Sequence, residues 1–116
     1  MQTIKLPHLA PVRFAQDLLM KEEKLARISL SFPMIPSLAM MVEAAAQSSA
    51  AFRVNDKENA YLVSLKGIVL HQKVSSKNLI AEIIDAYRLD KMRYVEFKIF
   101  EEDLCLASGT LVIAVQ

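Results

Sequence analysis

The sequence contains very little cysteine and almost no net charge. Its 116 residues include one cysteine, Cys105, so the chain can form no internal disulfide, which fits a reducing compartment. The 14 basic and 13 acidic residues give a net charge of +1. Nucleic-acid-binding proteins usually have a clear excess or cluster of basic residues, so we exclude that class.

The sequence also lacks a segment typical of export or of a membrane span. No apolar core of a secretory signal precedes Pro7. The only stretch long enough to suggest a membrane helix, residues 34–52, contains Glu43 near its middle. A central carboxylate costs about 2.5–3.5 kcal/mol on membrane-insertion scales. We therefore expect a cytoplasmic protein that has no membrane segment.

What the chain does contain is a large apolar fraction. Hydrophobic residues make up 53% of it, slightly more than is usual in a soluble domain. A chain of this length is expected to fold as one domain over residues 1–116. Because a domain this small buries a limited share of its surface, we expect a homodimer that hides the remaining apolar area.

Alternation of apolar and polar residues predicts strands over much of the chain. The clearest alternating apolar set is Ala26, Ile28, Leu30 and Phe32. Further strands are expected over residues 60–70, 79–87, 93–100 and 104–115. Gly67 predicts a bulge or bend within its strand. Residues 14–20 fit a strand or a short helix, and residues 6–12, with two prolines, fit an irregular segment.

One apolar run predicts a helix that begins at Pro36 or Ser37 and ends near Val54. Such a helix must bury its surface, and a curved sheet offers the only large apolar face available. The fold class is therefore α+β. We expect an antiparallel sheet wrapped around one long central helix, which is the hotdog fold.

Glu43 is the one charged residue in the apolar run 36–52 of this helix. A charged side chain rarely lies fully inside a protein unless it is paired or used. Two interpretations therefore remain open for Glu43. It either lines a functional pocket, or it pairs structurally with Arg53, a lysine or a backbone amide.

The segment Ser31-Phe32-Pro33, followed by Glu43-Ala44-Ala45-Ala46-Gln47, resembles the signature of the 3-hydroxyacyl-acyl-carrier-protein dehydratases. That signature is His-Phe-Pro-Gly, followed by Pro-Gly and Glu-Ala-x-Ala-Gln. The N-terminal Leu6-Pro7-His8 with Pro11 looks like their Leu-Pro-His-Arg-x-Pro segment, and residues 66–74 are similar to the strand after their helix. The likeness spans nearly the whole chain in the same order.

The resemblance implies a homodimeric hotdog protein of fatty acid or polyketide metabolism. Its implied partner is the thioester of an acyl carrier protein or of coenzyme A, with no cofactor. In the family, a histidine and a glutamate from opposite subunits face an acyl tunnel at the dimer interface. Carried onto this chain, the candidate catalytic residues are Glu43 and Ser31, the latter at the histidine position. The candidate substrate-binding residues are Phe32, Pro33, Met34, Met40 and Gln47.

Departures from the signature affect the chemistry. Dehydration needs a base for the C2 proton and an acid for the leaving C3 hydroxyl, and Ser31 cannot titrate near neutrality. Losing a positioned acid–base group costs about 10²–10⁴-fold in rate. The family glycine falls on Met34 or is deleted, and the loop between Pro33 and Glu43 is about two residues shorter than the family pattern. We therefore expect impaired or absent dehydratase activity. The alternatives are a non-catalytic acyl-binding or assembly subunit, and a thioesterase that uses Glu43 as general base.

The two histidines, His8 and His71, lack metal-ligand spacing with other histidines, cysteines or carboxylates, so we expect no metal site. His8 is expected to anchor the N-terminal segment, and His71 to lie at a strand end near the pocket mouth. Gln47 follows Glu43 by one helical turn on the same face. We expect Gln47 to hydrogen-bond Glu43 or the backbone of the preceding segment rather than substrate. Cys105 is expected to be a small core residue.

Overall fold

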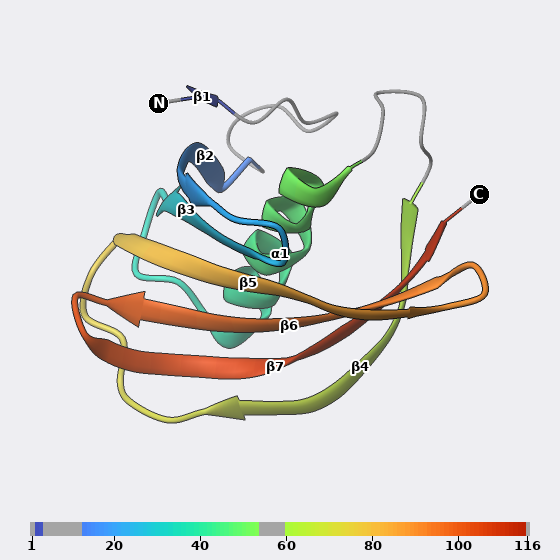
Figure 1. The fold of residues 1–116 in the computed structure, drawn as a ribbon. Coiled ribbons are helices and arrows are strands. Elements are labelled where there is room, and N and C mark those ends of the chain that lie inside the picture. Colours follow the sequence, from blue (N-terminus) through green and yellow to red (C-terminus); the bar gives the residue numbers. More distant parts are fainter. Residues whose placement is uncertain (1, 4–12, 54–59, 116) are drawn as a thin grey trace.

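The computed structural model describes residues 2–3, 13–53 and 60–115 (Figure 1). The first half contains β1 (Gln2–Thr3), β2 (Ala15–Lys21), β3 (Leu25–Ser31), α1 (Leu38–Ser48) and a 3₁₀ helix η1 (Ser49–Phe52). The second half contains β4 (Ala60–Leu70), β5 (Asn78–Leu89), β6 (Met92–Glu101) and β7 (Leu104–Val115). The predicted irregular segment 6–12, with His8, lies outside the described residues.

The strands form one seven-stranded sheet in the order β1-β2-β3-β5-β6-β7-β4, and every neighbouring pair is antiparallel. The sheet curves around α1, which lies in its hollow (Figure 1). The prediction of an antiparallel sheet around one helix is confirmed, and the ambiguous residues 14–20 belong to strand β2 from Ala15 onward. The sheet order places β4 at an edge, where it pairs with β7 alone among the described strands.

The core lies between α1 and the inner face of the sheet. The alternation predicted for β3 is confirmed, because Ala26, Ile28 and Leu30 are buried at every second position. Strand β6 contributes Val95, Phe97 and Ile99, and α1 contributes Met41, Ala44 and Ala45. Buried apolar area of this kind contributes about 25 cal/mol per Å² to folding.

Two glycines shape the strands that close the core. Gly67 has φ +60°, and the β4–β7 register shifts between Lys66 and Val69, so the predicted irregularity in β4 is confirmed. Only glycine adopts that conformation without strain. At Gly109 in β7 the reason is space, because Ile68 and the Phe97 ring occupy the volume that a Cβ would need. The two glycines therefore allow β4 to bend against the core.

The helix begins where the sequence predicts but is shorter than predicted. Ser37 is the N-cap, and its hydroxyl accepts a hydrogen bond from the Met40 backbone N–H over 3.2 Å. Ordinary α-helical geometry ends at Ser48, and the 3₁₀ turn carries the chain to Phe52. The Ser48 and Ser49 hydroxyls donate back to the Ala44 and Ala46 carbonyls over 2.8 and 2.6 Å. Such bonds compete with the helical ladder, which accounts for the early change to a tighter turn.

Candidate functional site

Glu43 lies on the side of α1 that turns away from the concave sheet. At 100° per residue, Ala39, Met40, Glu43 and Ala46 share this side, which we call the Glu43 side. Ala39 is exposed and the other three are half-buried among the described residues. The opposite side, including Met41, Ala44 and Ala45, is buried against the sheet. The apolar sequence predicts burial on nearly every side, but the described residues cover only part of the helix.

Gln47 extends the Glu43 side toward the start of β2. Its Nε2 donates to Glu43 Oε1 over 3.3 Å. Its Oε1 accepts hydrogen bonds from the backbone N–H groups of Phe14 and Ala15 over 2.7 and 3.1 Å. The predicted hydrogen bond to Glu43 is therefore confirmed, whereas the backbone partner is the start of β2 and not the segment directly before the helix. Such local and tertiary bonds explain why a polar side chain that is 3% exposed is tolerated here.

The segment that matches the dehydratase motif lies at the end of β3. Ser31 is exposed, and its backbone N–H donates to the Phe14 carbonyl over 2.9 Å. Phe32 is 4% exposed, and its ring centroid is 4.9 Å from that of Phe14. Pro33 and Met34 are exposed in the loop before α1. Phe32 therefore packs in the core of the single chain, whereas Pro33 and Met34 are accessible from solvent.

A groove lies between the N-terminus of α1 and the segment that follows β4. Its volume is about 520 Å³, and its apolar walls include Ile35, Leu38, Met41, Leu70 and Val74. His71 and Lys73 also line it. A second hollow, of about 330 Å³, lies on the outer face of the sheet among Glu82, Glu96, Lys98 and Thr110. Glu43 lines neither of these two hollows.

His71 follows β4 directly, as its predicted place at a strand end requires. Its Nε2 lies 2.7 Å from Ser108 Oγ, and its backbone N–H donates to the Leu106 carbonyl over 2.7 Å. His71 is therefore hydrogen-bonded to β7. His8 cannot be placed, since it lies outside the described residues. Cys105 in β7 is half-buried, slightly more accessible than the predicted core position.

The exposed large apolar residues are concentrated on β4. Six of them belong to this strand: Tyr61, Leu62, Val63, Leu65, Val69 and Leu70, each at least 43% exposed. Met34 and Ile35, in the loop next to the groove, are exposed to 59% and 47%. Because β4 is also an edge strand, its outer N–H and C=O groups and its apolar side chains are accessible together. Edges of this kind readily pair with another strand.

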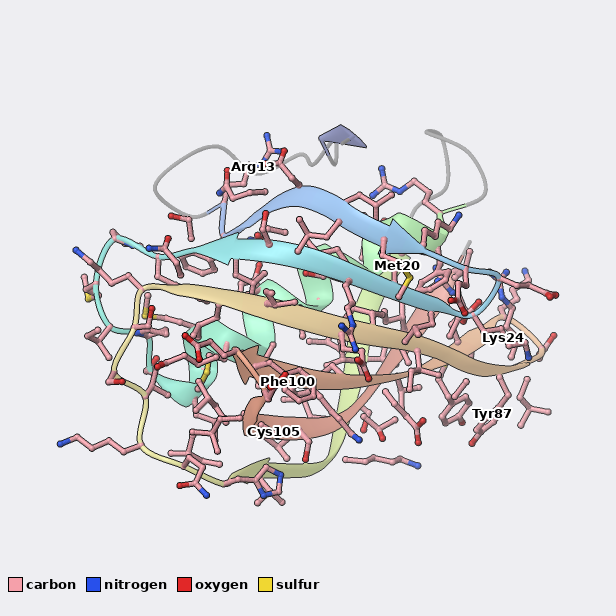
Figure 2. The ribbon with its side chains drawn as sticks, turned by 60° about the vertical axis from the view of Figure 1, so that its left-hand side comes forward. Arg13, Met20, Lys24, Tyr87, Phe100 and Cys105 are labelled. Carbon is pink, nitrogen blue, oxygen red and sulfur yellow. The ribbon has the colours of Figure 1, made fainter. Side chains whose placement is uncertain are left out.

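The sequence interpretation missed one buried charge. Arg93 is 3% exposed, and its Nε lies 3.9 Å from Asp85 Oδ1. Alternation contained the signal, because Arg93 shares its face of β6 with Val95, Phe97 and Ile99. The contact connects the neighbouring strands β5 and β6 at the hairpin end of the sheet. Tyr87 marks that end in Figure 2, with Phe100 and Cys105 farther along the sheet.

Two observations concern ligands and membranes. Within the described ranges, no three or more histidine, cysteine or acidic side chains gather closely enough to hold a metal ion. In the same part of the chain, no helix has the length and hydropathy required to cross a bilayer.

Comparisons with known proteins identify the fold. No protein-family model matches the sequence, and no curated protein sequence matches it. The dehydratase heterocomplex ApeI:P from Xenorhabdus doucetiae is similar in structure, with TM-score 0.78 and 14% identity over 96% of this chain and 88% of that one. An HP0420 homologue from Helicobacter felis gives TM-score 0.73 and 16% identity over 98% of both chains.

Thioesterase HI1161 from Haemophilus influenzae is also similar, with TM-score 0.69 and 13% identity over 86% of this chain and 77% of that one. These proteins have the hotdog fold, and the predicted hotdog architecture is thereby confirmed for this chain. At such low identity the similarity establishes the fold alone, because one fold hosts many activities.

Proposed function

We propose that this chain folds as one domain over residues 1–116 and forms a homodimer that binds acyl thioesters beside Glu43 without dehydrating them. The observation that carries the proposal is the position of Glu43. It is the only carboxylate of α1, and it lies half-buried on the helix side that the sheet does not cover. An apolar surface with one fixed polar group is typical of a small-molecule site. The sequence resemblance to the dehydratases supports an acyl thioester as the ligand.

The chemistry at Ser31 supports binding without dehydration. The family reaction needs an acid–base pair, and an isolated serine hydroxyl neither donates nor accepts a proton usefully near neutral pH. The hydrogen bond of the Ser31 backbone to Phe14 fixes the chain at this point but supplies no titrating group. Met34 is exposed and stands where the family has glycine. Its side chain would hinder the close approach of a thioester carbonyl to the backbone N–H groups at this position.

The edge strand supports the homodimer. A second copy of β4 could pair antiparallel with the first and cover Tyr61, Val63 and Leu65 at once. In this proposal, the acyl chain lies in a cavity that the two copies share. Phe32, Pro33, Met34 and Met40 are its proposed lining.

Two alternatives have specific support. The structural similarity to a dehydratase heterocomplex favours an assembly subunit, in which the β4 edge pairs with a different hotdog chain that supplies a histidine. The similarity to a thioesterase favours hydrolysis, with Glu43 as general base for the attacking water. The assembly subunit uses the same β4 edge as the proposed homodimer, and the hydrolase uses the same carboxylate, Glu43. Binding and activity measurements therefore distinguish the three.

The test uses the purified chain with two kinds of ligand. Calorimetry measures binding of an acyl-pantetheine thioether, which mimics the thioester but cannot react. Spectroscopic assays follow hydration of a crotonyl thioester and release of free thiol. We expect saturable binding that persists at reduced affinity in Glu43→Gln, no hydration, and no thiol release. Thiol release that disappears in Glu43→Gln would establish the hydrolase instead. Absence of binding by the wild-type chain would overturn the proposal.

A further inference from the structure

Gln47 connects three parts of the chain that are far apart in sequence. Gln47 is buried on α1. Its Oε1 accepts hydrogen bonds from the backbone N–H groups of Phe14 and Ala15 at the start of β2. Its Nε2 donates to Glu43 Oε1. The Phe14 carbonyl accepts the Ser31 N–H at the end of β3. A continuous set of hydrogen bonds therefore runs from the Glu43 carboxylate to the segment that carries Ser31.

The direction of the Gln47 amide follows from its partners. Two backbone N–H groups point at one end of the side chain, and a backbone N–H can only donate. That end must be the carbonyl oxygen, since a reversed amide would place NH₂ against two donors. The NH₂ group therefore faces Glu43, whose carboxylate accepts the bond. No alternative orientation of Gln47 satisfies all three partners.

The same contacts explain why glutamine suits this position. Glutamate would still accept from Phe14 and Ala15 but would set a second carboxylate against Glu43. A methionine of similar length would leave two buried N–H groups without their acceptor, a costly defect. Only an amide accepts on one end and donates on the other. The requirement for both functions links the backbone of β2 to the direction of the Glu43 side chain.

We infer that Gln47 is a positioning residue that sets the direction of the Glu43 carboxylate on the ligand-binding side of α1. It acts through Glu43 and does not touch the ligand. The part of this inference that is measured by thioether affinity rests on the proposed function. The coupling between Gln47 and Glu43 can also be measured without any ligand, so the two proposals can fail separately.

The test is a double-mutant cycle of wild type, Gln47→Glu, Glu43→Gln and the double variant. Gln47→Glu keeps the acceptor for Phe14 and Ala15, removes the donor to Glu43 and sets a second carboxylate against it. The double variant restores the bond in reverse, because a glutamine at 43 donates to a glutamate at 47. Melting temperature and affinity for the acyl-pantetheine thioether are measured for all four proteins at one fixed pH near neutrality.

We expect Gln47→Glu to lower the melting temperature and to weaken thioether binding about tenfold or more while Glu43 is present. In the Glu43→Gln background, the same change should leave both quantities close to those of Glu43→Gln alone. Failure of Gln47→Glu alone to fold, with a folded double variant, also supports the inference. Equal losses in both backgrounds, including failure of both to fold, would show that Gln47 serves the backbone alone. If the two substitutions affect the melting temperature non-additively but none of the four proteins binds the thioether, the inference about Gln47 holds and the proposed function is wrong.

Discussion

Gln47 and Glu43 lie one helical turn apart, and the amide of the first donates to the carboxylate of the second over 3.3 Å. The oxygen of the same amide is held by the backbone of β2. The direction of the Glu43 side chain is therefore determined by tertiary structure as well as by its own helix. The proposed acyl site depends on that arrangement and on a second chain at the β4 edge.

Filling the Glu43 side with a bulky residue should prevent binding. In Ala46→Trp, the indole would occupy the half-buried surface one turn from Glu43, and thioether affinity should fall at least about tenfold. Calorimetry measures the loss. The matched control is Leu104→Trp, in which the same side chain replaces an exposed residue at the start of β7. Equal binding by Ala46→Trp and wild type would place the ligand elsewhere.

A charge on β4 should weaken self-association. Val63 is 50% exposed and lies where the β4–β7 register shifts. In Val63→Lys, each copy would bring a positive charge to the proposed pairing edge, so we expect the dimer dissociation constant to rise about tenfold or more. Analytical ultracentrifugation over a concentration series measures it. Leu89→Lys, at a 64% exposed site on β5, should leave the constant unchanged. An unaffected dimer in Val63→Lys would rule out this edge.

The two glycines should respond to alanine for different reasons. In Gly109→Ala, the new methyl group would collide with Ile68 and the Phe97 ring, and we expect a loss of about 1–3 kcal/mol in the free energy of unfolding. Gly67→Ala meets no atom within 4 Å, but the φ of +60° should cost about 1–2 kcal/mol. Urea unfolding measures both. Trimming the obstructing side chain with Ile68→Ala should reduce the added cost of Gly109→Ala but not that of Gly67→Ala.

The helix N-cap should contribute measurably to stability. Ser37→Ala removes the acceptor for the Met40 N–H, and we expect the free energy of unfolding to fall by about 1 kcal/mol. Ser37→Asp keeps an acceptor and should remain within a few tenths of a kcal/mol of wild type. Thermal and urea denaturation measure the difference. Equal stability of the alanine and aspartate variants would show that this hydrogen bond does not stabilise the folded state.

The sequence predicts local features of this fold well. Alternation locates β3 and β6, Ser37 identifies the helix start, and Gly67 indicates the irregularity in β4. Each feature follows from neighbours in the chain, so a pattern of a few residues contains enough information. The helix end is different, because the hydroxyls of Ser48 and Ser49 act against a run of good helix formers.

The site is only partly predictable, for a physical reason. The interval between Glu43 and Gln47 predicts their contact, because residues four apart share a helix face. The bonds from Gln47 to Phe14 and Ala15 join positions 33 and 32 residues apart, and no local pattern encodes them. Likewise, alternation finds β4 but cannot place it at the edge of the sheet, because that position depends on the whole strand order.

Methionine-methyl NMR during a titration tests the central claim most directly. The chain has six methionines; Met40 lies on the Glu43 side, whereas Met92 begins β6 near the hairpin. With the acyl-pantetheine thioether as ligand, we predict a saturable shift of the Met40 methyl resonance and an unchanged Met92 resonance. If Met40 does not move at ligand concentrations that saturate calorimetric binding, the acyl group does not lie beside Glu43.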